Sequence, residues 1–147
     1  MADDAAFGGP AAHCHRLRVR YAETDQMGVA HHAAYVVWLE EARIAWLAAR
    51  GQSYRELEAG GLLLPVVELS IAYRRPARFD DALTLLTVAS QPGPTRLAFA
   101  TRIERDGVLL AEARVTVAAV DRHGRPQRLP AALAALLSQP PSPAECR

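Results

Sequence analysis

Four strand-like runs between residues 64 and 122, separated by short turn signals, restrict the fold of this chain more than any other feature. The runs are LPVVELSIAYRR, ALTLLTVAS, RLAFATRIER and VLLAEARVTVAAVDR, and the turn signals between them are RPARFDD, QPGPT and RDG. Short links of this kind favour antiparallel neighbours, because a parallel return needs a longer crossover. We therefore predict an antiparallel meander of four strands.

A long run upstream of these strands has helical spacing. In YVVWLEEARIAWLAAR, residues 35–50, apolar side chains recur along one stripe, and Gly51 follows as a stop signal. Further elements are a strand in LRVRY, a short helix in SYRELEAGG with Ser53 as its cap, and a last helix in PAALAALLSQ. The predicted class is α+β, with one long central helix packed against a curled five-stranded antiparallel sheet.

The length and composition indicate one domain. The chain has 147 residues, of which 50% are hydrophobic and 22% are charged, and its net charge is +1. Such a charge gives no general attraction to nucleic acid or to a membrane surface, and no run is apolar enough to span a membrane, so we expect neither as a partner. The ends are rich in Ala, Gly and Pro and lack periodicity, so we expect flexible tails at 1–13 and 139–147 around a domain at 14–138.

The two cysteines, Cys14 and Cys146, lie near opposite ends of the chain. A disulfide between them and two free thiols are both compatible with this arrangement, and we expect free thiols in a reducing cytoplasm. The first residues carry acids where a secretory signal carries bases, which also favours a cytoplasmic protein.

The stretch YAETDQMGVAHHAAY, residues 21–35, places polar residues between the first strand and the long helix. Asp25 supplies a carboxylate that can attack a carbonyl or take a proton from water. Gly28 allows a tight turn and close approach to the backbone. A helix that begins near His31 or His32 presents N–H groups without internal acceptors, which can stabilise an oxyanion. The combination suits acyl transfer from a thioester.

Other interpretations of these residues compete with a catalytic one. An aspartate in a loop, taken alone, is more often a turn or cap residue than a nucleophile. Adjacent histidines cannot both point into one site from a regular helix, so we expect His32 to be positioned and His31 to be incidental. A metal site built from His31, His32 and Asp25 or Glu23 lacks the usual ligand spacing, so we expect no metal. For Glu23 we favour solvation of the strand end over a second catalytic acid.

The run VRYAETDQMGVAHHAAYVVWLEEARIAWLAARG, with SIAYRRPARFDDALTLLT downstream, resembles the 4-hydroxybenzoyl-CoA thioesterase-like branch of the hotdog-fold acyl-CoA thioesterases. The similarity extends from about Leu17 to Pro130 and includes the spacing D-x-x-G-x-x-x-H-x-x-Y. It implies a hotdog fold and hydrolysis of an acyl- or aromatic acyl-CoA to free acid and coenzyme A. It also implies no metal or separate cofactor, and active sites between the subunits of a homodimer or homotetramer.

The resemblance also implies roles for individual residues. Asp25 matches the catalytic carboxylate, as nucleophile or general base. His32 matches the residue at the helix start whose backbone N–H polarises the thioester carbonyl. Gly28 and Tyr35 match the loop glycine and the first-turn aromatic residue of the family, and we place Val29 and His31 in the same substrate and oxyanion loop. Many members have asparagine where this chain has Ala34, so any hydrogen bond made there is lost or supplied elsewhere.

Four arginines are candidates for binding the phosphates of coenzyme A, since guanidinium groups are planar bidentate donors: Arg74, Arg75, Arg78 and Arg96. Alternatively, they form a solvated face that Asp80 and Asp81 neutralise.

Two other functions stay open at this stage. They are a thioesterase that acts on acyl carrier protein and a non-catalytic hotdog module that binds acyl-CoA.

Overall fold

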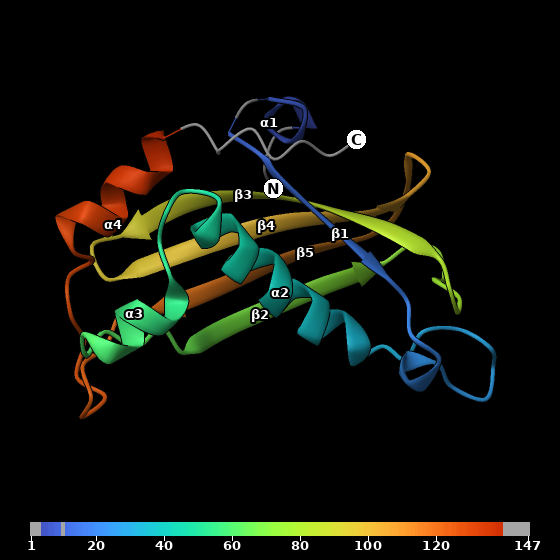
Figure 1. Ribbon diagram of the computed structural model, residues 1–147, viewed down its shortest axis with the longest axis horizontal. Coiled ribbons are helices and arrows are strands. Elements are labelled where there is room, and N and C mark those ends of the chain that lie inside the picture. Colours follow the sequence, from blue (N-terminus) through green and yellow to red (C-terminus); the bar gives the residue numbers. More distant parts are fainter. Residues whose placement is uncertain (1–3, 10, 140–147) are drawn as a thin grey trace.

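The computed structural model describes residues 4–9 and 11–139, in which a long helix, α2 (Ala34–Ala48), lies across one face of a five-stranded antiparallel sheet (Figure 1). The strands lie in the order β1-β3-β4-β5-β2. Their bounds are β1 (His13–Arg18), β2 (Val66–Tyr73), β3 (Ala82–Gly93), β4 (Arg96–Arg105) and β5 (Val108–Ala118). The predicted α+β class, with one long helix against a curled sheet, is confirmed.

The apolar stripe of α2 forms the centre of the core, as the helical spacing predicts. Trp38 and Trp46 are each 1% exposed, and the Trp46 ring meets the Phe99 ring of β4 edge-on at 5.8 Å. Aromatic side chains contribute a large buried area for each residue, so this face fixes the helix on the sheet. Gly51 has a φ of 78°, in the left-handed region that favours glycine, and it ends the helix where the sequence predicts.

The predicted meander of four strands is wrong in one pairing, because β2 pairs with β5 and β3 pairs with β1. Only β3, β4 and β5 form a meander. The links between these three strands are tight turns, whereas eight residues, 74–81, join β2 to β3. Eight residues reach up to about 26 Å, while the three strand spacings between β2 and β3 amount to about 14 Å. The link is therefore long enough to cross from β2, at one edge of the sheet, to β3, next to the other edge.

Several boundaries also differ from the prediction. The first strand covers residues 13–18 rather than 17–21, and the chain then forms a short 3-10 helix, η1 (Tyr21–Glu23). The segment predicted as an N-terminal tail contains one helical turn, α1 (Asp4–Phe7). The short helix α3 (Tyr54–Ala59) is capped as predicted, since the Ser53 hydroxyl accepts the Glu56 N–H at 3.2 Å. The last helix is α4 (Ala131–Ala135), followed by η2 (Leu136–Ser138).

Cys14 is disulfide-bonded, so the prediction of a free thiol at this position is wrong. The cysteine lies inside β1, paired with Leu86 of β3. Cys146 lies outside the described residues. Within residues 4–9 and 11–139, no helix has the length and apolar character needed to cross a membrane.

Candidate active site

The loop that carries Asp25 is closed on itself like a small hairpin. Thr24 and Ala30 form an isolated antiparallel bridge, and the Asp25 N–H donates to the Val29 carbonyl at 2.9 Å. The Gly28 N–H donates back to the Asp25 carbonyl at 3.0 Å. Gly28 has a φ of 79°, which side chains other than glycine rarely adopt, so the turn depends on this residue. The loop thus holds its shape through its own backbone.

The Asp25 carboxylate has one occupied and one available oxygen. Its Oδ1 accepts the Met27 N–H at 2.8 Å and the Val29 N–H at 3.4 Å. Its Oδ2 has no hydrogen-bond partner within residues 4–9 and 11–139. The turn interpretation and the catalytic interpretation are therefore compatible, because the bonds that close the turn also orient the side chain.

His31 caps the start of α2 with both its backbone and its side chain. Its carbonyl accepts the Ala34 N–H at 2.9 Å, and its Nδ1 accepts the Ala33 N–H at 3.1 Å. The imidazole also stacks on the His32 ring, with the ring centres 4.3 Å apart. His31 thus satisfies N–H groups that the helix leaves without a partner, which gives it a structural role that its spacing did not reveal.

Two backbone N–H groups at this helix start remain without acceptors. The Val36 N–H donates to the Ala33 carbonyl at 3.2 Å, so the first turn is tighter than a regular α-helical turn. In the part of the chain that the structure describes, the N–H groups of His32 and Tyr35 have no hydrogen-bond acceptor. They are free donors at the positive end of the helix dipole, which suits binding of an oxyanion.

A cavity of about 300 Å³ opens at this end of α2. Its lining residues are Val29, Ala30, His32, Tyr35, Tyr73, Arg74, Arg75 and Pro76. Tyr35 is buried, and its hydroxyl accepts the Ala77 N–H at 3.4 Å. Burial raises the pKa of the Tyr35 hydroxyl, which therefore stays neutral to a higher pH than an exposed tyrosine. The cavity therefore joins an aromatic wall to the free N–H donors, and the Asp25 loop enters it through Val29.

Glu23 connects the Asp25 loop to the helix, a role that the sequence did not reveal. Its Oε2 accepts the Trp38 indole N–H at 2.7 Å, and its Oε1 accepts the Arg20 N–H at 2.8 Å. Its backbone carbonyl accepts the His31 N–H at 2.7 Å. The Glu23 side chain is only 9% exposed and each of its oxygens accepts a hydrogen bond, so it does not solvate the strand end as predicted.

The four candidate arginines do not form one group within the chain. Arg74 and Arg75 line the cavity at α2, and Arg78 follows them in the link to β3. Arg96 pairs with Ala118 at the far end of β5, in the hairpin at the opposite end of the sheet from the Asp25 loop (Figure 1). The side chains of Arg75, Arg78 and Arg96 have no ion-pair partner in the described part of the chain.

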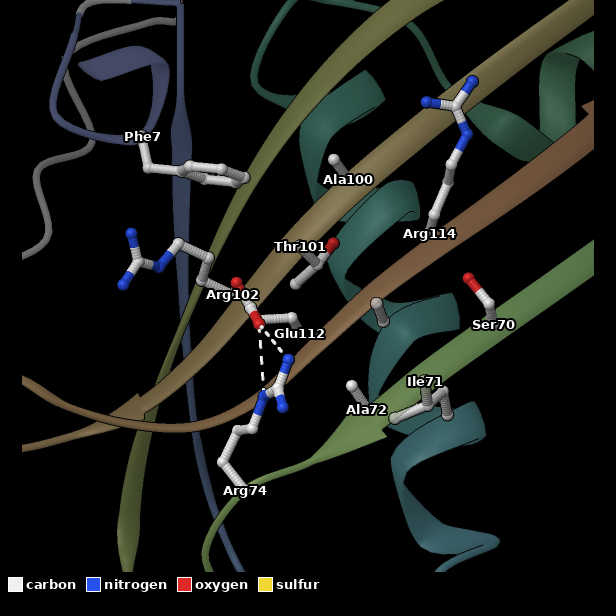
Figure 2. Close-up of a pocket in the computed structure, with 11 residues that line it drawn as sticks. Phe7, Ser70, Ile71, Ala72, Arg74, Ala100, Thr101, Arg102, Glu112 and Arg114 are labelled. Atoms are coloured by element: carbon white, nitrogen blue, oxygen red, sulfur yellow. Dashed lines mark hydrogen bonds and ion pairs between the residues drawn. The ribbon is translucent and has the colours of Figure 1, made fainter. Parts of the chain in front are cut away.

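Arg74 differs from the others because its guanidinium forms an ion pair with a carboxylate. Its Nε and Nη2 donate to Glu112 Oε2 at 3.3 and 3.1 Å (Figure 2). This pair lies along a second cavity of about 270 Å³, on the sheet face that points away from α2 (Figure 2). On the neighbouring strand β4, Arg102 lies opposite Glu112 of β5 in the strand register. The centre of the Phe7 ring lies 5.6 Å from the Arg102 guanidinium. This outer cavity is therefore separate from the Asp25 loop.

Residues 4–9 and 11–139 hold no group of three or more His, Cys, Asp or Glu side chains arranged to bind a metal ion. The two histidines that the sequence brings together are used in other ways. His31 accepts a backbone N–H, and the His32 ring stacks on it. Catalysis without a metal stays a prediction.

The Glu23–Trp38 hydrogen bond is expected to stabilise the protein and the loop together. We expect Trp38→Phe and Glu23→Gln to lower the free energy of unfolding non-additively, with a coupling of about 1–2 kcal/mol in a double-mutant cycle measured by urea unfolding. Amide hydrogen exchange in the Asp25 loop should become faster in each variant. Glu40→Gln on the exposed face of α2 is the matched control. Additive effects, or an unchanged loop, would contradict this role for Glu23.

Comparison with known proteins agrees with this arrangement. Residues 19–137 match the family described as the Thioesterase-like superfamily. The acyl-CoA thioester hydrolase YbgC of Escherichia coli O6:H1 is 36% identical over 125 residues, which span 84% of this chain and 93% of that protein. A shorter match, to YneP of Bacillus subtilis (strain 168), is 42% identical over 71 residues and spans 48% of this chain and 51% of that protein.

A solved structure extends the agreement to the fold. The hypothetical protein TT1821 of Thermus thermophilus has a TM-score of 0.81 and 42% sequence identity, over 85% of this chain and 96% of that one. The family match and this structural similarity confirm the hotdog fold predicted from the sequence. By its sequence over residues 19–137 and by its fold, the chain belongs to the Thioesterase-like superfamily.

Proposed function

We propose that this chain is an acyl-CoA thioesterase, which hydrolyses an acyl- or aromatic acyl-CoA to the free acid and coenzyme A. One observation carries the proposal. The Asp25 carboxylate, with a free Oδ2, lies on the loop that leads directly into a helix start with free N–H groups at His32 and Tyr35. A relative similar along most of its length is named an acyl-CoA thioester hydrolase. Placement in the 4-hydroxybenzoyl-CoA thioesterase-like branch is part of the same proposal.

The chemistry follows from these groups. The substrate carbonyl oxygen accepts the His32 N–H, which stabilises the negative charge as the carbonyl is attacked. In one route, Asp25 Oδ2 attacks the carbonyl carbon, coenzyme A leaves as the thiolate, and water then hydrolyses the mixed anhydride. In the other route, Asp25 takes a proton from a water molecule that attacks the carbonyl directly. Both routes need the same carboxylate, and neither needs a metal or a separate cofactor.

The nucleotide part of the substrate is proposed to contact the arginines that follow β2. Arg75 lines the cavity at α2 and has no ion-pair partner in the described part of the chain. Arg78 is exposed nearby in the same link. Arg74 is a weaker candidate because Glu112 already occupies its guanidinium. Arg96 lies too far along the sheet to bind the same ligand from within one chain, so it contributes only if a second subunit brings it close.

We also propose that the chain forms a homodimer, or a homotetramer built from such dimers, through the free edge of β2. This strand carries exposed apolar side chains, including Val67 at 48% and Leu69 at 39% exposure. Val36 and Val37 of α2 are exposed as well. An unpaired strand edge with apolar side chains is a ready surface for a second copy. The cavity at α2 lies beside this edge, since Tyr73 of β2 lines it.

Asp25→Asn is expected to abolish turnover without unfolding the chain. The amide oxygen can still accept the Met27 N–H, but the side chain can neither attack nor take a proton, so we expect kcat to fall by at least ~100-fold. The assay is thiol release, followed with a disulfide dye, from short, medium, long and aromatic acyl-CoAs.

Asp121→Asn is the matched control for this variant. Asp121 holds its own turn in the same way, with Oδ1 accepting the N–H groups of His123 and Arg125 at 2.8 and 3.0 Å, but this turn follows β5 and does not lead into α2. Equal turnover by the wild type and Asp25→Asn would contradict the catalytic role of Asp25. Release from an acyl carrier protein but from no acyl-CoA would replace the proposed substrate, and binding of acyl-CoA without release would indicate a binding module.

Arg75→Ala is expected to weaken binding of the nucleotide without slowing the chemistry. We expect KM for an acyl-CoA to rise about 10-fold while kcat stays within twofold, because a guanidinium–phosphate contact acts on the ground state and the transition state alike. The same acyl group on N-acetylcysteamine, which lacks the nucleotide, should give an unchanged KM. Arg55→Ala on α3 serves as the control. An equal loss on both thioesters would contradict a phosphate contact.

Leu69→Lys is expected to disrupt association at the β2 edge. Light scattering should give an even multiple of 16.0 kDa for the wild type and a lower even multiple, or 16.0 kDa, for the variant, because a charged side chain on the edge opposes strand pairing. Val108→Lys, at an exposed valine outside this edge, is the control. An active wild type that is monomeric would refute the proposed association.

A further inference from the structure

The Tyr73 side chain reaches from the edge strand β2 to the start of α2. Its hydroxyl donates to the His32 carbonyl at 2.9 Å, and its ring meets the buried Tyr35 ring edge-on, with centres 5.0 Å apart. Both rings line the cavity of about 300 Å³. Tyr73 itself is 48% exposed, so its position is not set by tight packing on all sides. The hydrogen bond to the His32 carbonyl is therefore the contact that fixes the Tyr73 hydroxyl.

This bond takes the place of a helical one. In a regular α-helix the His32 carbonyl would accept the Val36 N–H. Here the Val36 N–H donates to the Ala33 carbonyl at 3.2 Å instead, and α2 begins only at Ala34. The Tyr73 hydroxyl thus satisfies a carbonyl that the helix does not use. Without it, that carbonyl would lack a partner, and the N–H groups of Tyr35 and Val36 would be the nearest donors along the chain.

The peptide planes on both sides of the His32 Cα are fixed by this set of contacts. The plane that contains the His32 N–H is held because its carbonyl, from His31, accepts the Ala34 N–H at 2.9 Å. The plane that contains the His32 carbonyl is held by Tyr73, and its N–H, from Ala33, donates to His31 Nδ1 at 3.1 Å. Of the polar groups on these two planes, the His32 N–H is left without a partner in the described part of the chain.

We propose that Tyr73 is a positioning residue for thioester hydrolysis: its hydroxyl holds the His32 carbonyl outside the helix, so that the His32 N–H stays aimed at the substrate carbonyl. The proposal rests on the function proposed above. Loss of the hydroxyl frees the His32 carbonyl to accept the Tyr35 or the Val36 N–H, which extends α2 toward its N-terminus and turns residue 32 into the helix. An oxyanion donor is effective only in a fixed geometry, because small displacements cost much of the rate.

The test is Tyr73→Phe in the full chain, which removes the hydroxyl and keeps the ring that lines the cavity. We expect kcat on the preferred acyl-CoA to fall about 10-fold with KM within twofold, because the substrate pocket is kept and the transition-state contact is not. Tyr54→Phe on α3, which removes a hydroxyl outside the cavity, should change neither constant. An equal kcat for wild type and Tyr73→Phe would overturn the proposal.

A second measurement separates this inference from the proposed function. In 15N-labelled protein, Tyr73→Phe should shift the His32, Ala33, Tyr35 and Val36 amide resonances. It should also slow exchange of the Tyr35 N–H, because this group has no acceptor in the wild type and an extended helix gives it a carbonyl three or four residues back. These resonances are read without any substrate. If they stay at their wild-type positions, Tyr73 does not set the helix start, whatever the activity. If they shift while the wild type hydrolyses no acyl-CoA, the proposed function fails and the catalytic part of this inference fails with it.

Discussion

The hydrogen bond between the Trp38 indole and the Glu23 carboxylate joins the two parts of the candidate site. Trp38 belongs to the buried face of α2, at 1% exposure, and Glu23 ends the 3-10 helix that leads into the Asp25 loop. A carboxylate that is 9% exposed is costly unless its oxygens accept hydrogen bonds. The indole and the Arg20 N–H supply the donors. The buried core thus fixes the position of Glu23, where the loop begins, and the loop in turn fixes the position of Asp25.

The crossing of the chain from β2 to β3 supplies the remaining wall of the site. The link 74–81 passes the start of α2, where the Ala77 carbonyl accepts the Ala30 N–H at 2.7 Å and the Ala77 N–H donates to the Tyr35 hydroxyl at 3.4 Å. With β2 beside β3, as the turn signals suggested, Tyr73 and Arg75 would not reach this place. The strand order is therefore a condition of the site as well as a feature of the fold.

Local signals predicted much of this arrangement, and long-range contacts account for what they missed. The periodic stripe of α2, the Ser53 cap and the stop at Gly51 depend on neighbouring residues, and all three are confirmed. Glu23 and Tyr73 were missed because their partners lie 15 and 41 residues away in the sequence. Arg96 was grouped with Arg74, Arg75 and Arg78 by residue type and by the resemblance to the family, and residue type carries no information on the end of the sheet at which a side chain lies.

The same residues serve structure and chemistry here through different atoms. Asp25 closes its turn with Oδ1, which leaves Oδ2 for a substrate or a water molecule. The carbonyl and the Nδ1 of His31 accept the N–H groups of Ala34 and Ala33 at the helix start. In the described part of the chain, the His32 N–H has no partner. Tyr73 extends this division to the edge of the sheet, since one side chain joins β2 to the His32 carbonyl. In the proposed dimer, a second subunit on the β2 edge would contact the strand that carries Tyr73, and would thereby affect the position of the His32 N–H.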